Sequence, residues 1–337
     1  MGDKKAIPLQ PSLLKPLLVT ALLLAASLLP AQNLSGITGK KDTSYTTYSA
    51  FIKDKKHHPH IQLPVVPAND QVKQKLGIIY RSLGKRKLLL DAFHPVKAKS
   101  NGVAIIIIHG GGWRSGSRTQ HHDMAKVLAA KGYTCFTPQY RLSSEALFPA
   151  AVHDVKAAIQ WVRLHATAYG IDTAKIALAG FSAGGQLAAL AGTTGNMPVF
   201  QNEEINKGVS TEVSAIIDID GTLSFVHEES SERQSPDKWV ASALWLGYLP
   251  RENPVLWQLA SPLNFAAYSP PVLFINSSVK RMHAGRNDFI KILNERGVYH
   301  QLKTFADAPH SFCLFEPWFT PTIEVMDEFL KKIFVKN

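Results

Sequence analysis

The feature that most constrains this chain is a glycine-rich turn that directly follows an apolar, strand-like run. Lys175 to Ala179 is this run, and it leads into Gly180 to Gly184 with the sequence G-F-S-A-G. A serine placed this way between a buried strand and a helix needs a sharp backbone turn with nearly side-chain-free neighbours. We therefore predict that Ser182 is exposed at this turn as a nucleophile. The simpler alternative is a glycine-rich turn that only packs a helix against a strand.

Strand-like and helix-like patterns alternate along most of the chain. Val103 to Ile108 is a continuous apolar run, as expected of a strand that is buried on both faces of a sheet. Further strands are expected at residues 77–81, 87–93, 133–138, 175–179, 213–219, 271–275 and 302–305, and helices at 120–131, 149–169, 185–191, 287–296 and 322–335. This alternation predicts a single α/β domain: a mostly parallel central sheet with helices on both faces.

A second glycine run follows the strand at Val103 to Ile108 and has the sequence H-G-G-G-W, His109 to Trp113. Such a loop lets backbone N–H groups approach a carbonyl oxygen closely. We predict that the N–H groups of Gly111, Gly112 and Ala183 form an oxyanion hole. A phosphate-binding loop is the rival interpretation, but the Lys-Ser/Thr pair that such a loop requires does not follow.

A base is expected beyond the last strand, because a serine nucleophile at this kind of turn is followed by its acid and then its histidine. His310 lies in this place, in the sequence A-P-H-S-F. The chain has 13 histidines, so position rather than residue type identifies this one. We predict that His310 takes the proton of Ser182 and later returns it to the leaving group.

Six short motifs together resemble those of known enzymes. They are His109 to Trp113, Tyr140 to Leu142, Phe148 to Ala150, His153 to Val155, Gly180 to Gly184 and Ala260 to Pro262. The chain resembles the α/β-hydrolase esterases over about residues 77–334. It looks most like secreted bacterial carbohydrate esterases of the feruloyl and acetyl esterase type, and next like the hormone-sensitive-lipase-like esterases. The resemblance implies an α/β-hydrolase fold, an ester substrate, an acyl-enzyme intermediate, no metal and no cofactor.

The acid is the point where the chain departs from the family pattern. Lys280 occupies the position at which family members place an acidic residue, and a lysine cannot orient His310. We predict Asp220 as the replacement, because it follows the preceding strand, from which some lipases also supply their acid. Asp288 is the alternative. Asp218, Asp307 or no acid at all are the remaining possibilities.

The two ends of the chain differ in composition from its middle. An apolar run from Leu17 to Leu29 follows lysines and precedes a small-residue cleavage point, which predicts a signal peptide at 1–31 and a secreted or periplasmic protein. A retained single anchor is the alternative. Residues 32–70 are polar and predict a flexible N-terminal lead or a peripheral wrap, and 71–337 are predicted to form the α/β-hydrolase domain.

A small helical insert is expected at about residues 222–260, over the site. Its aromatic residues either pack in a core or line an acyl or sugar pocket; they are Trp239, Trp245, Tyr248 and Trp257.

Charge narrows the range of partners. The formal net charge is +11, which suits anionic surfaces or acidic polysaccharides. The basic residues are dispersed and no nucleic-acid motif accompanies them, so a nucleic-acid partner is not expected. Arg281 and Arg286 share one loop, where they either pair with a carboxylate of the substrate or form an ordinary salt bridge.

The resemblance implies a secreted serine esterase that removes small acyl groups, above all acetyl, from polysaccharide or oligosaccharide. A lipase-like short-chain carboxylester hydrolase is the nearest alternative, and a large apolar cap over the site would favour it. Lys280 also leaves room for a non-catalytic binding protein with a hydrolase fold.

Overall fold

The computed structural model describes residues 31–201, 208–230 and 237–334 of the chain. Almost all of the predicted signal peptide therefore lies outside the described residues. Eight strands form one sheet in the order β1-β2-β4-β3-β5-β6-β7-β8. They are β1 (Val72–Leu83), β2 (Arg86–Pro95), β3 (Ala104–Ile108), β4 (Thr134–Pro138), β5 (Ile176–Phe181), β6 (Ala215–Ile219), β7 (Val272–Asn276) and β8 (His300–Thr304). β2 runs antiparallel to both β1 and β4, and all the other neighbours are parallel.

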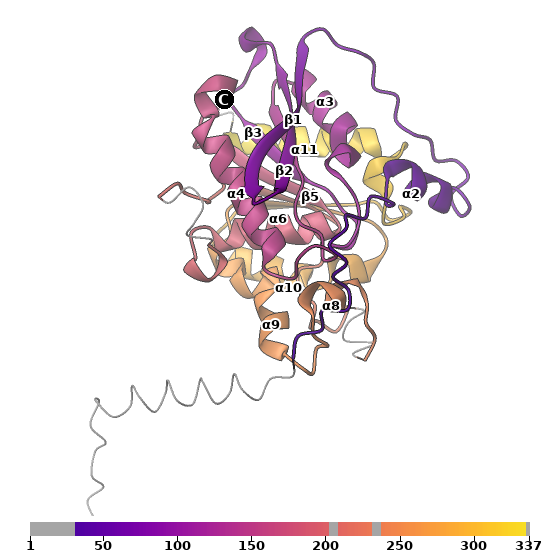
Figure 1. Cartoon of the computed structure of the whole chain (residues 1–337). Helices are drawn as coiled ribbons and strands as arrows, with labels where there is room; N and C mark the ends of the chain where they lie inside the picture. Colours follow the sequence, from indigo (N-terminus) through magenta and orange to yellow (C-terminus); the bar gives the residue numbers. More distant parts are fainter. Residues whose placement is uncertain (1–30, 202–207, 231–236, 335–337) are drawn as a thin grey trace, which may run out of the picture.

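Helices cover both faces of this sheet (Figure 1), which confirms the predicted α/β-hydrolase fold. α4 (Ala150–Leu164), α6 (Ala183–Thr194) and α10 (Arg286–Glu295) pack on one face, and α3 (His122–Ala130) and α11 (Phe319–Phe334) on the other. All five residues of β3 are buried, because side chains of alternating direction meet one helical layer or the other.

The remaining helices are short and lie outside these two layers. The α-helices are α2 (Thr47–Asp54), α5 (Ala166–Tyr169), α8 (Ala241–Leu246) and α9 (Pro254–Leu259). Short 3-10 helices lie at Lys97–Lys99, Arg118–His121, Pro198–Phe200, Pro262–Tyr268, Lys280–His283 and Phe312–Leu314. Within the described residues, no helix is both long enough and apolar enough to cross a membrane.

The single helix predicted at residues 149–169 is wrong, because it is interrupted at His165. The backbone of this residue leaves the helical region, with φ −106° and ψ 9°, so α4 ends and α5 begins there. The His165 ring stacks on Trp161 and its Nδ1 lies 2.7 Å from the Trp161 carbonyl oxygen. This local contact competes with continuation of the helix.

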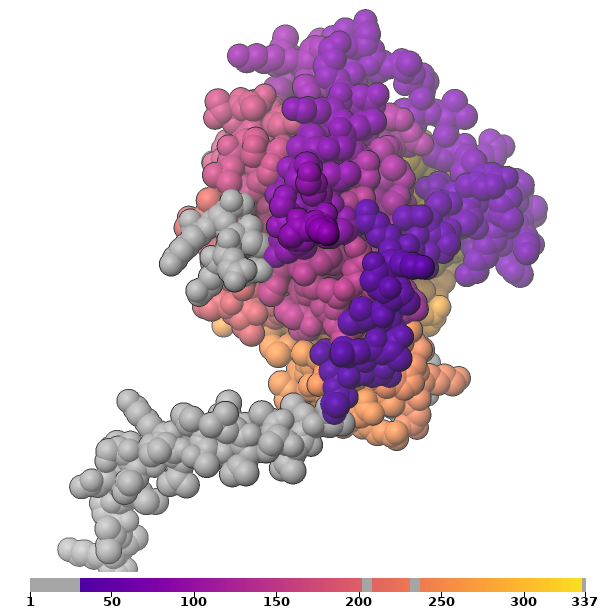
Figure 2. Space-filling model, in the orientation of Figure 1, coloured from indigo at the N-terminus to yellow at the C-terminus, as the bar shows by residue number. Residues whose placement is uncertain are grey.

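Residues 31–70, most of them predicted as a lead outside the domain, run over the surface of the sheet layers (Figure 2). The N–H groups of Thr38 and Gly39 both donate to the Ser144 carbonyl at 2.9 Å. Further along, α2 packs on the domain, where Phe51 meets Phe315 edge-on at 5.8 Å. The segment therefore packs against the domain and forms part of its surface.

The region expected to hold an insert, about residues 222–260, contains α8 and α9. Trp245 and Trp257 are fully buried and belong to the apolar cluster on the α4 and α6 face. Trp245 also stacks on Trp113 of the glycine loop at 4.9 Å. These two aromatic side chains thus pack in a core, the first of the two roles considered for them.

Candidate active site

Ser182 lies at the sharp turn between β5 and α6. Its backbone has φ 57° and ψ −120°, a conformation that costs a residue with a side chain roughly 1–3 kcal/mol and that is found at functional sites. Its N–H donates to the Ile219 carbonyl at 2.8 Å, and its carbonyl accepts from the Gln186 N–H at 3.0 Å. These two bonds fix the turn from the neighbouring strand and from the first turn of the helix.

The glycines beside Ser182 are required by close backbone packing. A Cβ on Gly180 would lie 2.0 Å from the Gly184 carbonyl oxygen. A Cβ on Gly184 would lie 2.2 Å from the Ile108 carbonyl oxygen at the end of β3. Both distances are far below van der Waals contact, so any side chain at either position would push the turn out of shape. The spacing of the G-x-S-x-G pattern follows from this geometry.

His310 lies in the loop after β8 and faces Ser182. Its Nε2 is 2.8 Å from the Ser182 Oγ, and its Nδ1 is 2.9 Å from the Asp220 Oδ2. An ionised carboxylate can only accept a hydrogen bond, so Nδ1 carries the proton and Nε2 accepts the Ser182 hydroxyl proton. The three side chains thus form one hydrogen-bonded chain, in the order predicted from the sequence.

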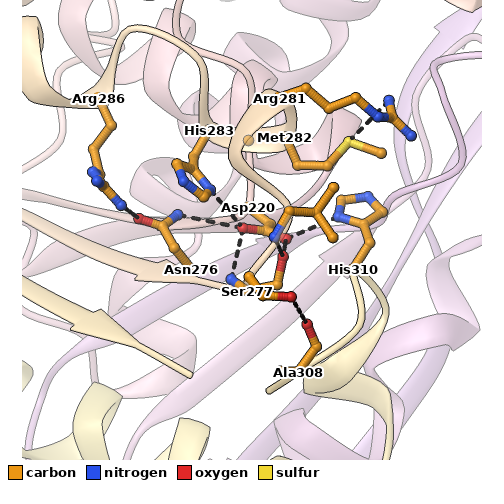
Figure 3. Close-up of polar contacts among 12 residues, drawn as sticks. Asp220, Asn276, Ser277, Arg281, Met282, His283, Arg286, Ala308 and His310 are labelled. Carbon is orange, nitrogen blue, oxygen red and sulfur yellow. Dashed lines mark hydrogen bonds and ion pairs between the residues drawn. The ribbon is translucent and has the colours of Figure 1, made fainter. Parts of the chain in front are cut away.

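Asp220 follows β6 directly and has the strained φ of 51°. Four neighbouring groups point at its buried carboxylate (Figure 3). The Ser277 N–H donates to Oδ1 at 2.9 Å and the Ser277 hydroxyl donates to Oδ2. Nδ1 of the buried His283 lies 3.3 Å from Oδ1, and Asn276 lies at the edge of hydrogen-bonding distance. The loop after β7 therefore holds Asp220 in place.

These donors decide the charge of Asp220. Burial by itself raises the pKa of this carboxyl, but hydrogen bonds from His283, His310 and Ser277 outweigh burial and lower the pKa. The pKa of Asp218, two residues away, shifts in the opposite direction. Burial, and then the nearby charge of Asp220, raise it well above the usual range. Asp220 is thus the ionised member of the pair and Asp218 the neutral one.

The other acidic residues considered for this role lie elsewhere. Asp288 is in the first turn of α10 with 60% of its side chain exposed, and it contacts His227 at 3.4 Å. Asp307 is exposed and accepts a hydrogen bond from Trp318. Lys280 is exposed at the start of the 3-10 helix Lys280–His283. The structure therefore brings Asp220, and not Asp288, to His310.

The glycine loop after β3 lies beside Ser182. Gly111 has φ 122°, and a Cβ there would lie 2.1 Å from the Ser115 carbonyl oxygen. Trp113 Nε1 donates to Gln186 at 2.9 Å, which ties the loop to α6. Gly111 and Gly112 line one pocket together with Ser182 and His310. Ala183 begins α6, so its N–H has no acceptor within the helix and is free to serve a ligand.

His109, at the start of this loop, is a buried residue that holds the loop. Its ring stacks on Tyr140 at 4.3 Å, and its Nδ1 lies 2.8 Å from the Gly110 carbonyl oxygen. Burial lowers the pKa of His109 to about 4, so the ring is neutral near pH 7. This arrangement agrees with a role in orienting the loop.

The pocket over Ser182 has a volume of about 590 Å³, and sequence reasoning missed much of its wall. Residues 42–54 contribute several lining side chains, among them Tyr45 and Lys53, although the sequence predicted this segment only as a flexible lead or a peripheral wrap. Tyr45 is within 3.4 Å of the Ser311 hydroxyl, next to His310. No short pattern in the sequence marks these positions, because they depend on where the segment crosses the domain.

His283 and Ser277 are further site residues that the sequence did not identify. The signal for Ser277 was its place directly after β7, in the same loop as Lys280. Arg286, considered above for a substrate carboxylate, instead donates to Asn276 at 2.9 Å and to Asn287. Among the described residues, no group of three or more His, Cys, Asp or Glu side chains is placed to hold a metal ion.

Comparisons with known proteins place this geometry in a family. The family model described as BD-FAE matches residues 90–282, more than half of the chain. The match includes the glycine loop, Ser182 and Asp220, and it ends before His310. The esterase LipC of Mycobacterium tuberculosis is 35% identical over 176 residues, which cover 52% of this chain and 43% of that protein. The chain spans about half the length of the curated relatives that it matches.

Solved structures of esterases have the same fold. A truncated carbohydrate esterase from gut microbiota superposes with a TM-score of 0.64 at 25% identity, covering 81% of this chain and all of that one. Esterase 2 of Thermogutta terrifontis, phosphorylated by paraoxon, gives a TM-score of 0.63 at 26% identity and covers 82% of this chain and all of that one. From the match to the family model and from the fold, we conclude that the chain belongs to the BD-FAE family of α/β-hydrolase esterases.

Proposed function

We propose that the protein is a serine carboxylic ester hydrolase with Ser182 as nucleophile, His310 as general base and Asp220 as the acid. One observation carries this proposal: the unbroken hydrogen-bonded chain from the Ser182 Oγ through the His310 ring to the buried, ionised Asp220. An aligned serine, histidine and carboxylate is the arrangement that activates a hydroxyl group for acyl transfer.

In the first half of the reaction, the Ser182 Oγ attacks the carbonyl carbon of the ester while His310 Nε2 takes the hydroxyl proton. The carbonyl oxygen becomes an oxyanion that accepts hydrogen bonds from the N–H groups of Gly111, Gly112 and Ala183. Each such donor contributes about 3 kcal/mol to lowering the barrier. The tetrahedral intermediate collapses, the bond to the alcohol oxygen breaks, and His310 gives its proton to the leaving alcohol.

In the second half, water attacks the acyl-enzyme and His310 takes one of its protons. Collapse of the new tetrahedral intermediate releases the carboxylic acid, and the proton returns from His310 to Ser182. Asp220 stabilises the imidazolium that forms in both halves without taking its proton.

For the substrate, we infer a small acyl group, above all acetyl, carried by a polysaccharide or oligosaccharide. Most of the residues that line the pocket have polar side chains, and sugar hydroxyls need such donors and acceptors; these residues include Asp42, Ser44, Ser49, Asp54, Arg114 and Ser115. The match in fold to a protein named as a carbohydrate esterase supports the same substrate class. An exported protein, as the N-terminal sequence predicts, would meet such polymers outside the cell.

A lipase-like hydrolase of short-chain carboxylic esters is the second candidate. Its support is that apolar atoms make up the larger part of the exposed pocket wall, those of Ala50, Ala241 and Met282 among them. An apolar wall would stabilise longer acyl chains by about 0.8 kcal/mol per buried methylene group. A series of p-nitrophenyl esters from acetate to octanoate separates the two: the saccharide esterase loses rate as the chain grows, whereas the lipase-like enzyme gains.

The decisive experiment compares wild type with Ser182→Ala on p-nitrophenyl acetate. We expect the wild type to show hydrolysis and the variant to lose it by several orders of magnitude. Stoichiometric labelling of the wild type by paraoxon, with none on Ser182→Ala, would identify the nucleophile independently. Equal rates for both proteins would overturn the proposal and leave a non-catalytic binding protein as the better description. Release of acetate from acetylated xylan then tests the substrate class.

A further inference from the structure

Three cationic side chains line the pocket that holds Ser182. Lys53 comes from α2, Arg114 from the glycine loop, and Arg281 from the 3-10 helix after β7. The three come from distant parts of the sequence, and the fold brings them to one pocket. Arg286 is excluded from this group, because its guanidinium is engaged by Asn276 and Asn287.

Within the part of the chain that the structure describes, none of the three cations forms a salt bridge. Nη1 of Arg114 is buried without a hydrogen-bond partner there. Two acidic residues, Asp42 and Asp54, also line the pocket. Asp42 already accepts hydrogen bonds from Ser44 and Ser115. The wall thus has one more positive than negative charge.

The position of Arg281 indicates whether it would contact the alcohol part or the acyl part of an ester substrate. Figure 3 shows the Arg281 side chain extending over the same side of the site as His310, and both residues line the pocket. In the proposed reaction His310 delivers its proton to the leaving alcohol, so groups beside His310 contact the alcohol part of the ester. The carbonyl oxygen of the acyl part contacts instead the N–H groups of Gly111 and Gly112.

Resting on the proposed function, we propose that this pocket contains a subsite for a carboxylate on the alcohol part of the substrate. The preferred substrate is then an acylated oligosaccharide that contains uronic acid. Among the described residues, Nη1 of Arg281 donates only to Met282 Sδ, a weak acceptor, at 3.6 Å, so the guanidinium can offer paired N–H donors that match a carboxylate. Lys53 and Arg114 add positive charge around it. The net positive charge of the whole chain increases the local concentration of such polymers.

The test measures kcat/KM on two acetylated oligosaccharides, one an oligogalacturonide and the other a neutral xylo-oligosaccharide. The wild type is expected to favour the acidic substrate, and Arg281→Gln and Lys53→Gln are each expected to reduce that preference about twofold to fivefold. Lys280→Gln and Lys56→Gln are matched controls. Each removes one positive charge from an exposed lysine close in sequence but outside the pocket, and each should keep the wild-type ratio. Added salt should raise KM for the acidic substrate alone.

Three results would overturn the subsite. The first is no preference of the wild type for the oligogalacturonide, and the second is an equal loss of preference in the pocket variants and the matched controls. The third is a preference for carboxylate on the acyl part, tested with p-nitrophenyl hydrogen adipate against p-nitrophenyl butyrate. Failure of the proposed function is distinguishable from all three, because it removes hydrolysis of p-nitrophenyl acetate by the wild type.

Discussion

At the scale of single residues, the position of Asp220 is the most informative feature of the site. Asp220→Asn keeps the size of the side chain but leaves an amide that can donate to His310 and favour the wrong tautomer. We expect kcat on p-nitrophenyl acetate to fall by about 10⁴ with little change in KM. Asp288→Asn is the control and should keep wild-type turnover, because its side chain points to solvent. The reverse pattern would remove Asp220 from the mechanism.

His283 provides a second prediction at this scale. Its Nδ1 donates to the same carboxylate as His310, and this bond is one of the causes that lower the pKa of Asp220. Removing it raises that pKa, so the carboxylate becomes protonated at a higher pH than in the wild type. For His283→Ala we expect kcat to fall about tenfold, within the range for a hydrogen bond to a charged group. The acidic limb of the pH profile should also move to higher pH, because the base His310 then faces a carboxylate that has lost one competing donor and holds the imidazolium more strongly.

A purely structural role of His283 would lower the amount of folded enzyme without moving the pH profile. Measuring kcat per active site, titrated with paraoxon, separates the two effects. An unchanged acidic limb with normal kcat per site would contradict a role in holding Asp220. Lys280→Ala, on the same 3-10 helix but exposed, serves as the control.

At the scale of elements, α4 carries a buried charge that the mechanism does not use. Burial lowers the pKa of Lys156 from 10.5 to about 7, and its ammonium donates to the Gly195 carbonyl beyond the end of α6. Between these two pKa values the unfolded chain binds more protons at this residue than the folded chain. The unfolding free energy must therefore rise with pH from 7 towards 10.5, by at most about 1.4 kcal/mol per pH unit.

Urea unfolding of wild type and Lys156→Met at pH 7, 8 and 9 tests this contribution. The wild type should gain stability relative to the variant as pH rises, because only the wild type loses a buried charge. Lys97→Met replaces an exposed lysine and should follow the wild type at every pH. Parallel curves for wild type and Lys156→Met would show that the folded protein keeps this amine charged throughout.

Most elements could be predicted from the sequence, since a parallel sheet buries its central strands on both faces. The apolar runs at β3, β5 and β7 reflect this directly. The break at His165 could not be predicted, because it depends on a ring that stacks on Trp161 within an otherwise apolar pattern. At the site, the motifs located Ser182 and the glycine loop, while the donors around Asp220 come from the fold of the next loop.

At the scale of the whole molecule, the N-terminal segment and the domain build one pocket together. Composition marked residues 32–70 as polar, and polar segments usually carry too little apolar surface to pack. The segment nevertheless contains Ala50 and Ile61, which are buried against the α3 and α11 face. A few buried side chains of this kind can hold a segment on the surface of a domain. They follow no helical or strand periodicity, so the sequence pattern does not predict them. The motifs that located Ser182, the glycine loop and His310 therefore could not predict which residues form the wall of the pocket.

The N-terminal segment lines the pocket, whereas the domain carries the reacting groups, so a change in the segment should affect substrate binding more than the chemical step. Phe51 anchors α2 to Phe315, five residues beyond His310, while Ser182, His310 and Asp220 all lie in the domain. Phe51→Ala should loosen α2, raising KM for acetylated oligosaccharides while p-nitrophenyl acetate is hydrolysed nearly as before. It should also cost about 1–2 kcal/mol of unfolding free energy, in line with the partial burial of its ring. Ile52→Ala, on the exposed side of α2, should leave both quantities unchanged. If Phe51→Ala instead abolished both activities equally, the segment would be needed for the nucleophile itself rather than for holding the substrate.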